Sequence, residues 1–137
     1  MRLSVLAAII AWLVPQICVA QPNPVTLEKI RVSCTTAPCS GNDTVVFVHG
    51  INGSAETFQN GTFDWPLGFP PTIGNRAVDV YRVDYRSSLL SWAQGRNPLF
   101  DDVVDKVVEK LSEIRTKEYR SIGFIAHSLG GNIVASY

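Results

Sequence analysis

Apolar and polar positions follow one another along this chain in segments of two kinds. Residues 44–48 form a β-branched apolar run of the length of a buried strand, residues 78–85 read as a second strand, and residues 122–125 form a third. Between the last two, apolar side chains recur every three or four residues with acidic ones opposite, which predicts an amphipathic crossover helix with a cap at Asn97 and Pro98. Alternating strands and helices indicate an α/β fold with a parallel sheet. The apolar positions of the helix are Leu99, Val103, Val104, Val107, Val108, Leu111 and Ile114.

The first twenty residues have the pattern of a signal peptide. Arg2 precedes an apolar run at residues 5–14, and small residues at Cys18 and Ala20 suit a signal peptidase. We expect cleavage after Ala20, which leaves one domain at residues 21–137 and predicts a secreted or periplasmic protein. A retained membrane anchor is the weaker alternative, because ten apolar residues are short for a span. The bulky Ile17 argues against a lipoprotein signal at Cys18.

Composition narrows the function by exclusion. The 137 residues carry 12 basic and 12 acidic side chains, so the chain has no electrostatic footprint for nucleic acid. With Cys18 removed, Cys34 and Cys39 remain, and in an exported protein we expect them to form a disulfide. A zinc site would need two ligands besides the cysteines, and the two histidines, His49 and His127, lie in the two motifs described below. We therefore expect no metal site and no cofactor.

The third strand leads directly into Ala126-His127-Ser128-Leu129-Gly130. A serine on a sharp turn between a strand and a helix is exposed as a nucleophile, and such a turn needs small residues two positions before and after it. Ala126 and Gly130 meet that need, and Gly131 is expected to let the helix start close to the sheet. A string of this kind also arises by chance, so the context must support it.

The first strand supplies that context, since it ends in His49-Gly50-Ile51-Asn52-Gly53. The two segments together, "VVFVHGINGSAETF" and "IGFIAHSLGGNIV", resemble the α/β-hydrolases, in particular small secreted bacterial lipases and related serine esterases. The resemblance implies that Ser128 is the nucleophile and that the backbone N–H groups of Ile51 and Leu129 form the oxyanion hole. His49, Gly50, Ala126, His127 and Gly130 would then support the loop and the turn.

The same resemblance shows what is missing. In such hydrolases the serine is followed by an acid and then a histidine, but the nine residues after Ser128 contain neither. His127 is adjacent to Ser128 and points to the other side, and the resemblance gives His49 a structural role. Among the acids, Asp84 has the best position, at the end of its strand, and is expected to order its loop. We therefore expect the N-terminal part of an α/β-hydrolase domain, with the C-terminal strands missing and no activity alone.

Two functions remain open at this point. The first is an exported serine hydrolase of a carboxylic ester, lipase-like or esterase-like, with a small-molecule or lipid ester as substrate and transient contact with a membrane or lipid surface. The second is a non-catalytic, degenerate hydrolase-like domain that binds a ligand. The aromatic and proline-rich residues 63–71 either contact an acyl chain or, as we favour, pack their loop on the sheet.

Overall fold

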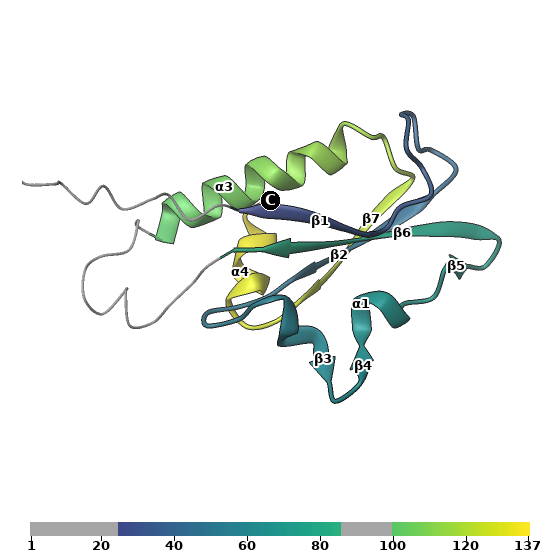
Figure 1. The fold of residues 1–137 in the computed structure, drawn as a ribbon. Helices are drawn as coiled ribbons and strands as arrows, with labels where there is room; N and C mark the ends of the chain where they lie inside the picture. The colour runs from purple at the N-terminus through teal and green to yellow at the C-terminus, as the bar shows by residue number, and fades with distance from the viewer. Residues whose placement is uncertain (1–24, 86–99) are drawn as a thin grey trace, which may run out of the picture.

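A mixed sheet with its two longer helices on one face forms the centre of the computed structural model, which describes residues 25–85 and 100–137 (Figure 1). Across the sheet the order is β1, β6, β2, β7, and β2 runs parallel to both of its neighbours. The three expected strands are therefore present, with the first of them between the other two. The bounds are β1 (Thr26–Arg31), β2 (Asp43–Val48), β6 (Arg76–Asp84) and β7 (Ser121–Ala126).

The central strand β2 is buried along its whole length, which explains its apolar residues 45–48, and its polar residues Asp43 and Thr44 are buried as well. Val46 and Val48 face one side of the sheet, and Val45 and Phe47 face the other. Each side therefore has a hydrophobic cluster of its own.

Two helices cover the first side, α3 (Phe100–Arg115) and α4 (Leu129–Ala135) (Figure 1). Val107, Leu111 and Ile114 of α3 and Ile133 of α4 are fully buried in the cluster with Val46 and Val48. The amphipathic crossover helix is thus confirmed. Its expected cap at Asn97 and Pro98 lies outside the described residues. No helix in the described part of the chain is long and apolar enough to cross a membrane.

The connection from β2 to β6 covers the second side without a long helix. Phe58 and Phe69 pack edge-on against Phe47, with ring centroids 5.1 and 6.0 Å apart. This aromatic contact holds an irregular segment against the sheet. Its elements are η1 (Ala55–Phe58), β3 (Gln59–Asn60), β4 (Phe63–Asp64), α1 (Trp65–Gly68) and β5 (Thr72–Ile73).

Strand β1 lies at one edge and pairs with β6 in the antiparallel sense. The sequence pattern does not reveal it, because an edge strand exposes polar side chains such as Glu28 and Lys29. After β1, Cys34 and Cys39 form a disulfide, as expected. The carboxylate of the buried Asp79 accepts hydrogen bonds from the Ser33 and Cys34 amides and fixes the start of this loop on β6.

At the opposite edge, β7 pairs with β2, and within the described residues it has no other strand beside it. Its apolar side chains, including Ile122, Phe124 and Ile125, are half-buried.

Candidate active site

Ser128 occupies the turn between β7 and α4 in a strained conformation. Its backbone has φ 52° and ψ −123°, in the region of positive φ that residues with a side chain rarely adopt. Such a residue costs about 1–3 kcal/mol and persists only where the surroundings enforce it. Ser128 is exposed, and within the described part of the chain its hydroxyl makes no capping hydrogen bond to α4. The turn therefore presents the hydroxyl to solvent.

Gly130 is the residue that lets α4 cross the end of β2 so closely. A Cβ atom at this position would lie 2.4 Å from the carbonyl oxygen of Val48 and 2.6 Å from that of His49. Gly131 behaves differently, since a Cβ atom there would meet nothing within 4 Å. The expectation that Gly131 also serves the close approach is wrong, because its Cα faces open space. Ala126 is exposed at the end of β7, in register with Val48.

The loop after β2 lies directly against this turn. A Cβ atom on Gly50 would be 2.8 Å from the His127 carbonyl oxygen, 2.8 Å from Ser128 Cβ and 3.2 Å from the Leu129 nitrogen. Only glycine allows this approach. The fold thus brings the two sequence motifs into contact at one end of the sheet.

Two backbone amides lie at this contact. Leu129 is the first residue of α4, so its N–H has no acceptor within the helix. Ile51 follows Gly50, and its side chain is 40% exposed. Ile51 and Leu129 are thus the residues that follow Gly50 and Ser128, the two residues that the contact brings together.

His49 is fully buried, and both of its ring nitrogens are engaged in the loop. Nδ1 lies 2.9 Å from the Gly50 carbonyl oxygen, and Nε2 lies 3.2 Å from Asp84 Oδ1 and 3.2 Å from the Tyr85 amide nitrogen. The ring stacks on Tyr85 at 4.2 Å, and the Tyr85 hydroxyl donates to the His49 carbonyl oxygen. Burial raises the pKa of this hydroxyl, which keeps it protonated as a donor. His49 is therefore not directed at Ser128.

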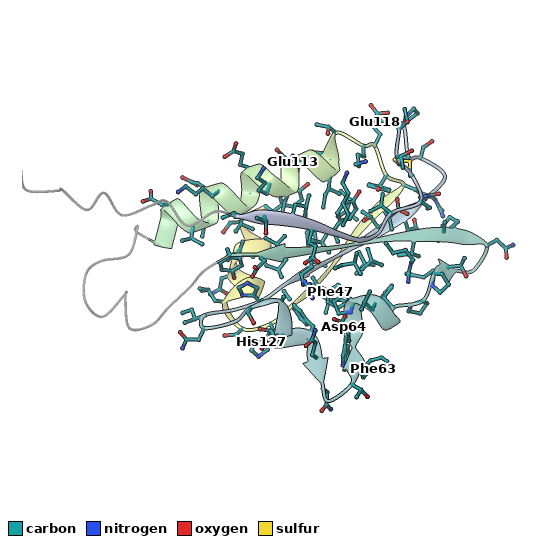
Figure 2. All side chains as sticks on the ribbon, in the orientation of Figure 1. Phe47, Phe63, Asp64, Glu113, Glu118 and His127 are labelled. Carbon is teal, nitrogen blue, oxygen red and sulfur yellow. A yellow bond between two sulfur atoms is a disulfide. The ribbon has the colours of Figure 1, made fainter. Side chains whose placement is uncertain are left out.

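His127 is also separate from the serine hydroxyl, although it is the preceding residue. Its amide donates to the Val48 carbonyl oxygen at 3.0 Å, and its carbonyl oxygen accepts from the Gly130 amide. Its side chain is exposed (Figure 2). In the described part of the chain no hydrogen bond joins Ser128 to either histidine, so neither has the position of a general base.

Three residues that support the loop are only partly visible in the sequence. Asp84 is expected there because it ends a strand, and the structure places it on the His49 ring. The position of Tyr85 or Gly53 in the sequence does not indicate a role in the loop. Gly53 is required because a Cβ atom on it would lie 2.7 Å from His49 Nδ1. The presence of two glycines in one loop after a strand is the sequence feature that points to this requirement.

In the aromatic stretch at residues 63–71, some side chains pack against the sheet and others are exposed. Pro66 is buried, and Phe69 contacts Phe47, which agrees with the favoured packing role. Phe63, Trp65 and Leu67, however, are 54%, 55% and 63% exposed. Figure 2 shows Phe63 on the outer side of this segment.

The comparisons with known proteins indicate a serine esterase family. The family model described as "Putative serine esterase (DUF676)" matches residues 40–137, and the chain belongs to this family. The match includes both motifs of the site. It supports a serine esterase in general and not the narrower likeness to small secreted bacterial lipases. Comparison with curated proteins and with solved structures gave no significant match.

Proposed function

We propose that this protein is a serine hydrolase of carboxylic esters, built on an α/β-hydrolase fold. Ser128 is the nucleophile, and the amides of Ile51 and Leu129 form the oxyanion hole. The observation that carries this proposal is the contact of Gly50 with Ser128 and Leu129 across a strained turn. Family membership supports the class, and the contact supports the assignment of these residues.

The proposed reaction begins when Ser128 Oγ bonds to the ester carbonyl carbon. The carbonyl oxygen takes the electron pair and becomes an oxyanion, to which Ile51 and Leu129 donate hydrogen bonds. Collapse of this intermediate expels the alcohol and leaves an acyl-enzyme, which water hydrolyses to the acid. A general base takes the proton of the serine hydroxyl and passes it to the leaving alkoxide, and we assign that role to neither His49 nor His127.

Labelling with a fluorophosphonate tests the nucleophile. In the protein isolated as its source produces it, we expect Ser128 to form the phosphonyl adduct, because the tetrahedral phosphorus places an oxygen in the oxyanion hole. Peptide mapping identifies the labelled residue, and Ser128→Ala should remove the label without unfolding the protein. Labelling at Ser54 or Ser136 would refute the assignment. A folded protein without labelling or ester turnover would favour the non-catalytic binding domain.

We propose further that the protein is exported and loses residues 1–20. The Cys34–Cys39 disulfide supports this, since such bonds persist in oxidising compartments. N-terminal sequencing of the protein isolated from its source should begin at Gln21. A protein that retains Met1 would refute the processing step.

A lipid surface is the proposed place of contact with the substrate. Residues 59–71 include a single charged side chain, Asp64, whose carboxylate accepts from the Leu67 amide and from Gln59. Exposed tryptophan and leucine on such a neutral segment suit the lipid–water interface. Replacing Trp65 and Leu67 by serine should abolish sedimentation with phosphatidylcholine vesicles, whereas Ile73→Ser is the exposed apolar control. Equal sedimentation of all variants would refute the contact.

A further inference from the structure

We infer that His49, anchored by Asp84, is a positioning residue that sets the direction of the Ile51 N–H. This inference rests on the proposed function, because it concerns the oxyanion hole assigned there. The proposed hole consists of backbone N–H groups, and the inference names the side chains that orient one of them.

The argument starts from the peptide group between Gly50 and Ile51. Its carbonyl oxygen accepts from His49 Nδ1 at 2.9 Å and from the Gly53 amide at 3.0 Å. The peptide is trans, so its C=O and N–H point in opposite directions. Two donors that hold the oxygen on one side therefore hold the Ile51 N–H on the other side, away from the imidazole.

The imidazole can donate to the Gly50 carbonyl oxygen only with a proton on Nδ1, and this oxygen, which can only accept, favours a proton there. Nε2 accepts from the Tyr85 amide when the ring is neutral. When the ring carries both protons, Nε2 donates to Asp84 Oδ1 instead. Whichever of these partners Nε2 has, Nδ1–H can donate to the Gly50 oxygen and hold the Ile51 amide in the same direction.

The sheet register explains why these residues meet. Val48 of β2 and Val83 of β6 are partners, so the residues that follow them, His49 and Asp84, leave adjacent parallel strands side by side. Tyr85 then provides a flat surface under the ring and a hydroxyl for the His49 carbonyl. The ring is fully buried, while the Asp84 side chain is 47% exposed. Asp84 can therefore be changed without opening the core.

Two matched pairs of variants test the inference by the rate of fluorophosphonate labelling at Ser128. His49→Phe keeps a ring on Tyr85 but loses the donor, and we expect labelling about ten- to a hundredfold slower. His49→Asn keeps an N–H near the position of Nδ1 and should restore most of the rate. Asp84→Ala should slow labelling about three- to tenfold, whereas Asp84→Asn, which can still bind Nε2, should stay within about twofold.

Tyr119→Phe is the control for a general loss of stability. It removes a buried hydrogen bond to Asp79 at the other end of the sheet, and it should lower the melting temperature without slowing labelling. Equal rates in His49→Phe and wild type, or equal slowing in His49→Phe and His49→Asn, would overturn the inference. If His49→Phe does not fold, the labelling rates of Asp84→Ala and Asp84→Asn test the inference instead. Equal rates in Asp84→Ala and wild type, or equal slowing in the two Asp84 variants, would overturn it.

A separate measurement distinguishes this inference from the proposed function. NMR of the imidazole nitrogens in the wild-type protein should show a proton on Nδ1 of His49, protected from exchange. If Ser128 is never labelled but Nδ1 is protonated and protected, the proposed function fails and the positioning of the peptide stands. A neutral ring with its proton on Nε2 would overturn the positioning, whatever the labelling shows.

Discussion

Replacing Gly130 by alanine tests the close crossing on which the whole site depends. The new Cβ would lie 2.4 Å from the Val48 carbonyl oxygen, whereas real Cβ atoms essentially never come closer than 3.0 Å to a neighbour. The start of α4 must therefore move by at least about 0.6 Å away from a central strand that is buried on both sides. Both nearest atoms belong to backbone, which cannot rotate away as a side chain can.

Overpacking of this kind costs about 1–3 kcal/mol, and two backbone contacts place Gly130→Ala near the upper limit. Alanine recovers up to about 1 kcal/mol through its helix propensity. We therefore expect a net loss of about 2 kcal/mol, equal to a fall of about 6–8 °C in melting temperature for a domain of this size. The shift should also move the Leu129 amide and slow labelling of Ser128.

Gly131→Ala is the matched control, because the two glycines are neighbours in the same helix and a Cβ on Gly131 meets nothing within 4 Å. Its melting temperature should be equal to that of wild type or up to about 3 °C higher. Thermal unfolding followed by circular dichroism measures both variants. If Gly130→Ala is as stable as Gly131→Ala, the close approach of α4 to β2 is not a constraint, and the explanation of the site fails with it.

Three further predictions concern strain, the disulfide and pH. Ser128→Gly should be more stable than Ser128→Ala by about 1 kcal/mol in urea unfolding, since glycine accepts the positive φ; equal stability would contradict the strain. Serine at both Cys34 and Cys39 should lower the free energy of unfolding by about 2 kcal/mol, as expected for a short closed loop, and an unchanged urea midpoint would refute this. Burial raises the pKa of Asp79, but its hydrogen bonds together outweigh that effect and leave the pKa below its usual value. Its stabilisation is therefore present above about pH 4 and is lost as the pH falls through the folded-state pKa. Asp79→Asn should make the urea midpoint less dependent on pH between about 2 and 5, and an unaltered dependence would count against this.

The strands that carry the site can be predicted from the sequence because they are buried. The apolar residues of β2 and β6 follow directly from the positions of these strands inside the sheet. The edge strand β1 escapes prediction, because half of its side chains face solvent. The segment after β2 also escapes, since its short elements depend on contacts of Phe58 and Phe69 with Phe47 rather than on local propensity.

The candidate site, like the fold, can be predicted only in part from the sequence. The position of Ser128 follows from a local requirement, namely small residues around a strand-to-helix turn, and Gly130 meets it in the structure. The interaction of His49 with Asp84 follows from sheet register, which no local pattern specifies. Gly131 shows the opposite error, in which a local pattern suggests a constraint that the tertiary structure does not impose.

The two motifs depend on each other for their conformations. Ser128 keeps an unfavourable φ because Gly130 locks α4 over β2, and the His127 amide is bound to Val48 on the same strand. That crossing is possible only where the chain beyond β2 has no side chain in the way, which is the role of Gly50. The residue that clears space for the turn also carries the carbonyl that His49 binds. The proposed nucleophile and the proposed oxyanion donor therefore depend on one set of backbone contacts, so a change that moves one should move the other.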